Sequence, residues 1–124
     1  MSYKIGKVED FKTVNKGKGF TVIPTGKIDP AFSITYINLT DGRDPGDIDK
    51  VTEVNPGNNV LYILMKGEIA FTLYGESTET VTLKEKEYIY LTPGTKYEIT
   101  GSGELALVMT PAYSDKTFYH PKKT

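Results

Sequence analysis

Cysteine and tryptophan are absent from this sequence of 124 residues, and histidine occurs only once. Without cysteine the chain can form no disulfide, no thiolate metal site and no cysteine nucleophile. The single histidine, His120, lies close to the C-terminus. We interpret it as a solvated tail residue, with a place at a subunit interface or a pocket mouth as the alternative. Catalysis by a histidine-paired nucleophile is excluded unless His120 reaches back to the site.

An excess of charge of either sign is also lacking. The 15 basic and 16 acidic side chains leave a net charge of −1. This balance provides no cationic surface of the kind that nucleic acid or an anionic membrane attracts. No apolar run is long enough to cross a bilayer or to act as a signal sequence. We therefore expect a cytoplasmic protein that has neither nucleic acid nor a membrane as its partner.

The length and the composition, 38% hydrophobic and 25% charged, suit one globular domain. We predict an N-terminal arm at residues 1–18, a single β-domain at residues 19–112 and a C-terminal tail at residues 113–124. The arm has single apolar residues spaced about three apart, and we expect one short turn in it near residues 9–11.

Short runs rich in β-branched and aromatic residues follow one another from residue 20 to residue 110, divided by glycine, proline and other turn formers. In residues 32–39, large apolar and small polar side chains alternate, as in a strand with one buried face. Residues 41–47 are dense in turn formers and are predicted to form a loop. The other predicted strands are residues 20–23, 50–54, 60–66, 68–74, 78–84, 87–91, 95–100 and 104–110.

Many short strands without a convincing amphipathic helix predict an all-β protein. Periodicity alone leaves an immunoglobulin-like sandwich, a lipocalin-like barrel and a jelly roll all open.

Two segments carry a resemblance that decides among these folds. Residues 60–68 read Val-Leu-Tyr-Ile-Leu-Met-Lys-Gly-Glu, and residues 88–95 read Tyr-Ile-Tyr-Leu-Thr-Pro-Gly-Thr after the approach Leu-Lys-Glu-Lys-Glu. In their spacing and turn residues they resemble the two central motifs of the cupins, and the similarity extends over about residues 44–111. The resemblance implies a cupin-like double-stranded β-helix, or jelly-roll barrel, with Gly67 and Gly94 in tight turns.

The metal ligands of that family are not found at the matching positions. The family's glutamate falls on Val60, and the histidine of its second motif falls on Tyr97. Its His-x-His pair falls on Glu53 and Asn55 or, with an insertion at residues 56–59, near Ile48 and Lys50. These side chains do not replace the imidazoles and carboxylates that hold divalent transition metals. We therefore expect no metal and no cofactor.

Tyrosine is abundant, with nine among the 124 residues. Because Val60 has the position of an inward ligand in the family, the period of two along a strand places Tyr62 and Leu64 inward as well. Tyr97 is inward by the same comparison. We expect a barrel mouth with apolar walls and a few hydroxyl groups. Alternatively, the tyrosines fill the barrel and bond to nearby backbone. The candidate ligand-binding residues are Glu53, Asn55, Tyr62, Tyr90, Tyr97 and Tyr36.

The favoured function is a metal-free cupin that binds a carbohydrate or another small metabolite, and whether it is an enzyme is left open. The alternatives are a metal-independent sugar epimerase or isomerase, with tyrosine and a carboxylate as acid and base, and a structural or protein-interaction role. An inward Glu53 with a perturbed pKa beside Tyr97 in a deep pocket would favour catalysis, whereas a filled barrel would favour a scaffold.

A homodimer is also expected. If Tyr62 points inward, then Leu61, Ile63 and Met65 point away from the barrel interior. Exposed together, they would form an apolar patch of a kind that soluble monomers rarely carry.

Overall fold

The computed structural model describes residues 5–17, 19–24, 29–114 and 116–123. In this part of the chain the regular structure is antiparallel strand, apart from one 3-10 turn, η1 (Val8–Asp10). The strands are β1 (Val14–Gly17), β2 (Phe20–Pro24), β3 (Ser33–Asp44), β4 (Thr52–Val54), β5 (Asn59–Tyr74), β6 (Thr78–Leu83), β7 (Tyr88–Leu91), β8 (Lys96–Thr110) and β9 (Phe118–Tyr119). The all-β prediction and the short turn expected near residues 9–11 are both confirmed.

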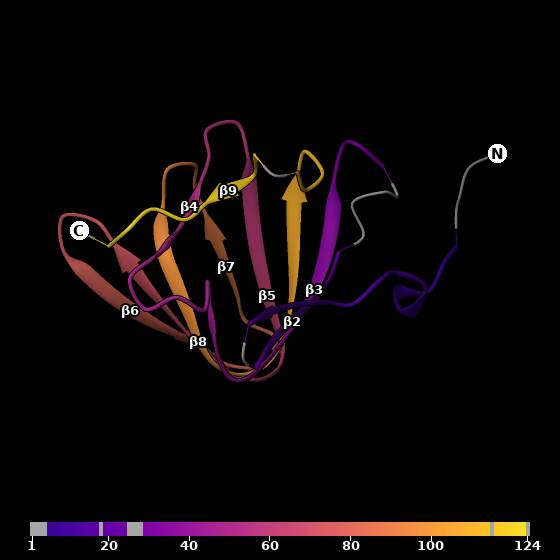
Figure 1. Ribbon diagram of the computed structural model, residues 1–124, viewed down its shortest axis with the longest axis horizontal. Helices are drawn as coiled ribbons and strands as arrows, with labels where there is room; N and C mark the ends of the chain where they lie inside the picture. The colour runs from indigo at the N-terminus through magenta and orange to yellow at the C-terminus, as the bar shows by residue number, and fades with distance from the viewer. Residues whose placement is uncertain (1–4, 18, 25–28, 115, 124) are drawn as a thin grey trace.

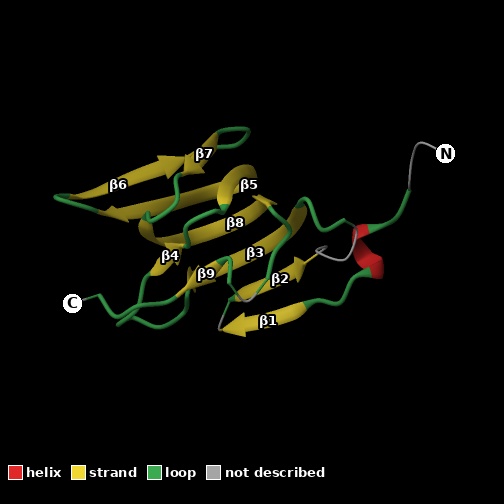
Figure 2. Cartoon of the chain, turned by 90° about the horizontal axis from the view of Figure 1, so that it is seen from above, coloured by secondary structure: helices red, strands yellow, loops and turns green. Residues whose placement is uncertain are grey.

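The two long strands β5 and β8 form the centre of the sheet. Strand β8 pairs with β5 along its whole length, and its other edge pairs with β3 and, near its start, with β4. Beyond β3 the sheet continues through β2 to β1, β9 is added to β4, and β6 and β7 both pair with β5. The sheet curls, so that β1 and β2 lie at one side and β6 and β7 at the other (Figure 2).

The curl depends on a sharp bend at the base of the sheet, where β5 and β8 approach each other closely (Figure 1). Gly67 in β5 has a φ of +93°, and a Cβ atom there would lie 2.3 Å from the carbonyl oxygen of Ser102. A Cβ atom on Gly103 in β8 would lie 2.3 Å from the carbonyl oxygen of Lys66. Only glycine tolerates such contacts, and its backbone adopts positive φ without strain. The two glycines therefore allow the strands to bend without ending.

This bend corrects part of the prediction. Gly67 was expected in a tight turn between two strands, but β5 runs through it without interruption. The division expected between residues 100 and 104 is wrong for the same reason, because β8 also continues through the bend. The turn at Gly94 is confirmed: Gly94 has a φ of 86° and Thr95 donates a backbone hydrogen bond to Thr92.

A second correction concerns the loop predicted at residues 41–47. Strand β3 includes the first four of these residues and ends at Asp44. Gly42, Arg43 and Asp44 pair with residues 101, 100 and 99 of β8 after an irregularity in the register. The turn-forming composition was overridden because β8 offers this segment a partner edge, which the local sequence does not reveal.

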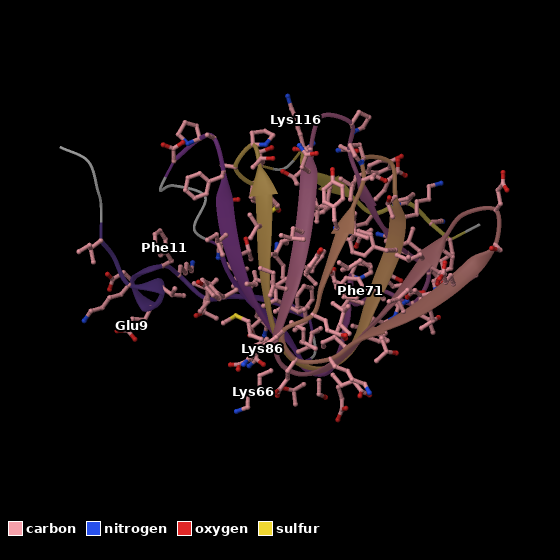
Figure 3. The ribbon with its side chains drawn as sticks, turned by 180° about the vertical axis from the view of Figure 1, so that it is seen from behind. Glu9, Phe11, Lys66, Phe71, Lys86 and Lys116 are labelled. Carbon is pink, nitrogen blue, oxygen red and sulfur yellow. The ribbon has the colours of Figure 1, made fainter. Side chains whose placement is uncertain are left out.

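The interior of the curled sheet is packed on one side by aromatic rings. Tyr62 and Tyr97 are almost fully buried, and each lies edge-on to the other with ring centroids 5.9 Å apart. The ring centroids of Phe71 and Tyr62 are 5.1 Å apart, and Phe71 points into the interior (Figure 3). Lys66 and Lys86, also labelled there, lie at the bend. The expected alternation along β5 is confirmed, since Tyr62 and Leu64 are buried and Met65 is exposed.

Both ends of the chain add strands to the sheet. Residues 14–17 pair with β2, and residues 118–119 pair with β4. The C-terminal segment is held further by backbone hydrogen bonds from Val51 to Pro121 and from Lys123 to Asp49. The domain boundaries at residues 18 and 112 stay a prediction. No helix in the described residues has both the length and the hydrophobicity that a membrane crossing requires.

Candidate functional site

A cavity of about 430 Å³ lies between the β1–β3 side of the curled sheet, the interior of β5 and β8, and the C-terminal segment. Its walls are mostly apolar, with a small number of polar and charged side chains, the usual composition of a small-molecule site. The barrel is therefore not filled on this side. The cavity is lined by Val14, Lys16, Phe20, Val22, Pro24, Thr35, Ile37, Asp44, Pro45, Asp47, Lys50, Thr52, Tyr62, Leu107, Met109, Tyr113, Phe118 and His120.

Asp44 is the buried acidic group of this cavity. It is the last residue of β3 and pairs with Ile99, whose side chain is in the core. Partners across an antiparallel ladder point to the same face of the sheet, so the Asp44 side chain also points inward. Burial raises the pKa of Asp44 from 3.8 to about 7, although the positive charges of Lys16 and Arg43 act in the opposite direction. At neutral pH both the acid and the carboxylate are therefore populated.

A pair of hydroxyl groups lies beside the cavity. The hydroxyl oxygens of Tyr62 and Tyr97 are 2.7 Å apart, and Tyr62 lines the cavity while Tyr97 lies behind it in the core. Burial raises the pKa of both tyrosines well above 10, and the negative charge of Asp44 raises both further. The hydrogen bond between them lowers the pKa of Tyr62 and raises that of Tyr97, as expected when Tyr97 donates and Tyr62 accepts. The proton of Tyr62 is then free to point elsewhere.

The mouth of the cavity carries charged and polar side chains. The Nδ1 atom of His120 lies 3.3 Å from the hydroxyl oxygen of Thr52, which joins the C-terminal segment to β4. Partial burial lowers the pKa of His120, and the nearby charges of Lys50 and Lys16 lower it further, against a hydrogen bond with the backbone of Val51. His120 is exposed, as expected of a tail residue, but it also lines the cavity, which agrees with the alternative position at a pocket mouth. His120 remains partly open to solvent.

A different carboxylate, Glu98, is buried on the other face of β8. Its side chain accepts a hydrogen bond from the Tyr74 hydroxyl and forms ion pairs with Arg43 and with Lys123, the latter at 2.9 Å. Arg43 precedes Asp44 in β3 and therefore points to the opposite face. Glu98 does not line the cavity.

The structure brings together only part of the set of candidate ligand-binding residues. Tyr62 and Tyr97 are inward and in contact, as predicted. Tyr90 and Tyr36, two of the candidates for the barrel mouth, do not line the cavity. Tyr90 pairs with Leu61 on the outer face, is 50% exposed and donates a hydrogen bond to the Asn59 side chain. Tyr36 lies on the outer face of β3, in the alternate positions to the buried residues.

Glu53 and Asn55 do not line the cavity either. Thr52 and Val54 are the buried residues of β4, so Glu53 points to the other face. There its charge and a side-chain hydrogen bond raise the pKa of the exposed Tyr119 hydroxyl. The side-chain amide of Asn55 donates to the carbonyl oxygen of Lys116 at 2.6 Å, so it holds the C-terminal segment. The condition that would have favoured catalysis, an inward Glu53 beside Tyr97, is therefore not met.

Sequence reasoning missed Asp44, the buried acid of the site. In the sequence it stands in Asp-Gly-Arg-Asp-Pro-Gly-Asp, which reads as a loop. No local signal separates it from Asp41 and Asp47 in the same stretch. Only the register with β8 shows that it is buried and points into the cavity.

Solved structures with the same architecture provide the comparison. Two variants of Pac13 from Streptomyces, both with uridine, match with TM-scores of 0.78 at 20% and 21% identity, over 98% of this chain and 93% of theirs. A further Pac13 structure, described as a nucleoside dehydratase, matches with a TM-score of 0.77 at 22% identity, over 98% of this chain and 92% of that one. Oxalate decarboxylase from Bacillus subtilis matches with a TM-score of 0.75 at 14% identity, over 90% of this chain and 30% of that one.

The chain has a cupin fold. No protein-family model and no curated protein matches the sequence. The structural likeness, at these identities, concerns the fold.

The positions that hold a metal in the resembled motifs do not suit one in this cupin-fold chain. Val60 and Tyr97 stand where the resemblance places glutamate and histidine, and both are buried among core side chains. Among the described residues, no three side chains of His, Cys, Asp or Glu come together in a group that could hold a metal ion. An apolar side chain and a buried tyrosine with a raised pKa are poor ligands for divalent transition metals. That the protein works without a metal stays a prediction.

Proposed function

We propose that the cavity binds a small, polyhydroxylated organic molecule of about the size of a nucleoside, without a metal. The observation that carries this proposal is the cavity of about 430 Å³ with a buried carboxyl group in its otherwise mostly apolar wall. Apolar walls favour the flat or hydrocarbon part of a ligand, and a few polar groups fix its orientation. Thr35, Asp44 and Thr52 offer hydroxyl and carboxyl groups that suit the hydroxyls of a sugar.

The comparisons support a ligand of this kind. Pac13 has been solved with uridine, and the match extends over nearly the whole of both chains. Each of these two structures has phenylalanine in place of one tyrosine, at a different position in each. The two replaced tyrosines are nearly as far apart in that sequence as Tyr62 and Tyr97 are in this one, where the separation is 35 positions. We therefore choose uridine and D-ribose as the first probes.

The test is a comparison of two threonine-to-phenylalanine variants. Thr35 is buried and lines the cavity, so Thr35→Phe fills part of it, whereas Thr82 is exposed on β6 and does not line it. Ligand that binds the folded state alone raises the midpoint of thermal unfolding. We expect uridine or D-ribose at millimolar concentration to raise the midpoint of the wild type and of Thr82→Phe, and to leave that of Thr35→Phe unchanged.

Titration calorimetry on the same three proteins gives the affinities directly. The proposal is wrong if neither probe binds the wild type, or if Thr35→Phe binds as tightly as Thr82→Phe. Circular dichroism of both variants controls for folding, because overpacking near the core typically costs about 1–3 kcal/mol.

A further inference from the structure

Asp44 has an unusual position for a buried carboxyl group. It is 8% exposed, and among the described residues its side chain makes no hydrogen bond and no ion pair. A buried carboxylate without a partner is costly, so such groups normally pair with a cation or a hydrogen-bond donor. In the described residues, every side-chain oxygen or nitrogen in the interior either has a hydrogen-bond partner or is accessible to solvent. The Asp44 oxygens are therefore reachable from the cavity that the side chain lines.

Tyr62 provides a hydrogen-bond donor on the same cavity. The hydroxyl oxygens of Tyr62 and Tyr97 lie 2.7 Å apart, and either group can be the donor of this hydrogen bond. When Tyr97 donates, the O–H group of Tyr62 is free to donate into the cavity. Asp44 and Tyr62 both line the cavity, and the negative charge of Asp44 contributes to the raised pKa of Tyr62. Removal of a proton from the carbon next to a carbonyl group requires a base and a hydrogen-bond donor to the developing oxyanion. A carboxyl group and a hydroxyl group in one apolar cavity can fill these two roles.

We propose that Asp44 and Tyr62 form a metal-independent proton-transfer pair that acts on a small hydroxy-aldehyde or hydroxy-ketone held in the cavity. This inference rests on the proposed binding function and names its substrate class. The Asp44 carboxylate takes the proton from the carbon beside the carbonyl group, and the electron pair of that C–H bond becomes a carbon–carbon double bond. The carbonyl π electrons move to the oxygen, which accepts a hydrogen bond from Tyr62.

The return step closes the balance. The protonated Asp44 gives its proton back to the same carbon, and the oxyanion reforms the carbonyl group. If the proton goes instead to the neighbouring, former carbonyl carbon, the hydroxyl proton of the substrate moves to the oxyanion, and that hydroxyl oxygen becomes the new carbonyl oxygen. No electrons leave the substrate, so neither an oxidant nor a metal is needed. Tyr62 keeps its proton throughout, because burial raises its pKa well above 10 and a phenolate there would be costly. A carboxyl group with a pKa of about 7 can both accept and return a proton at neutral pH.

Two lysines, an aspartate and a histidine also line the cavity, but none of them is a buried acid like Asp44. They are Lys16, Lys50, Asp47 and His120. Lys50 and Asp47 form an exposed ion pair at 3.9 Å. His120 is at the mouth, where its Nδ1 atom contacts Thr52. Arg43 points away from the cavity and is paired with Glu98. Asp44 is therefore the group that can act on a ligand inside the cavity.

The experiment measures deuterium exchange at the carbon beside the carbonyl group. D-glyceraldehyde, D-erythrose and D-ribose are incubated in D₂O with each protein, and proton NMR follows the loss of the C–H signal. General acid–base catalysis contributes about 10²–10⁴-fold. We therefore expect the wild type to accelerate exchange of at least one probe, Asp44→Asn to lose roughly 100-fold of that rate, and Tyr62→Phe to lose roughly 10-fold.

Asp49→Asn is the matched control. Asp49 is exposed, lies five residues after Asp44 and does not line the cavity, so the same loss of a charge there leaves the exchange rate unchanged. Thermal unfolding with each probe separates binding from chemistry. Probe that stabilises the wild type without faster exchange, or exchange that is equal in Asp44→Asn, overturns this inference and leaves the binding function intact. A failure of uridine and of all three sugars to bind overturns the binding function, and this inference with it.

Discussion

Two buried carboxyl groups lie on opposite faces of the same sheet, and their surroundings differ. Glu98 is surrounded by Arg43, Lys123 and the Tyr74 hydroxyl, so its charge is compensated. Asp44 has no such partner among the described residues and faces a cavity instead. The first arrangement stabilises the fold and fastens the C-terminal segment. The second one leaves a buried carboxyl group facing the cavity, at the expense of stability.

The Glu98 cluster also keeps Arg43 away from its neighbour. Arg43 and Asp44 are adjacent in β3, but the pleat sends their side chains to opposite faces. Because Arg43 is engaged by Glu98, it acts on Asp44 only at a distance. Burial then dominates and the pKa of Asp44 stays raised. The two sites are thus coupled through one pair of consecutive residues.

The largest effect should come from replacing Asp44. Its pKa is 3.8 when unfolded and about 7 when folded, so between these values the folded state holds a proton that the unfolded state has lost. The contribution of Asp44 to stability is therefore complete below pH 4 and is lost as the pH rises to 7, by about 4 kcal/mol at 1.36 kcal/mol per unit. Asp44→Asn, which cannot ionise, should match the wild type at pH 4 and be more stable above pH 7.

Urea unfolding of both proteins from pH 4 to pH 8 measures this difference directly. Subtracting one curve from the other removes the contributions of His120 and of the other ionisable groups that the two proteins share. Asp49→Asn should follow the wild-type curve, because Asp49 is exposed. If the curves of the wild type and Asp44→Asn ran parallel, the raised pKa would be wrong.

Breaking the other site should have the opposite sign. Glu98→Gln leaves Arg43 and Lys123 without their counter-charge, and removal of one partner from a buried ion pair costs about 3–5 kcal/mol. We expect a loss near the lower limit, about 3 kcal/mol at pH 7, because the Arg43 and Lys123 side chains are 21% and 32% exposed. Glu104→Gln, an exposed change in the same strand, should stay within about 0.5 kcal/mol. Similar losses for the two variants in urea would show that Glu98 is not an ion-pair centre.

The tyrosine pair forms the boundary between the cavity and the packed core. In Tyr62→Phe the Tyr97 hydroxyl stays in the dry core without its acceptor, which costs about 2 kcal/mol. In Tyr97→Phe the Tyr62 hydroxyl still reaches the cavity, so the loss is that of one hydrogen bond, about 1 kcal/mol. Denaturant unfolding of both variants checks the order. An equal loss, or the reverse order, would mean that Tyr62 does not face an open cavity.

The smallest effect on the stability of the chain concerns neither carboxyl group but the outer face of β5. Met65 is 52% exposed there, and Tyr88 and Tyr90 on β7, which pair with Ile63 and Leu61 of β5, are also exposed. If two copies pair through this face, Met65→Asp should lower the mass measured by light scattering from that of a dimer to about 13.8 kDa, with stability changed by about 0.5 kcal/mol or less. Thr78→Asp on β6 serves as the control. A wild-type mass near 13.8 kDa at micromolar concentration would contradict the dimer.

The strands and their faces could be predicted because strand periodicity is a local property, whereas the cupin-like architecture followed from the resemblance of two motifs. Alternation along residues 60–65 identified Tyr62 and Leu64 as one face and Leu61 and Met65 as the other, and the structure agrees. The turn at Gly94 followed from Pro-Gly in the same way. By contrast, Gly67 was expected to end a strand. The sequence does not show that Gly103 of β8 lies against it, which allows β5 to bend there and continue.

By itself, then, the sequence determined that this protein is built of strands, which side chains share a face within each strand, and that the family's metal-ligand positions hold Val60 and Tyr97. The tertiary structure decided which faces enclose the cavity. It turned Tyr90 and Tyr36 outward, brought His120 back from the tail, and placed Asp44 opposite Ile99, inside. The reason is physical: the period of two fixes relative facing only within a strand, whereas burial depends on the register with a partner far away in the sequence.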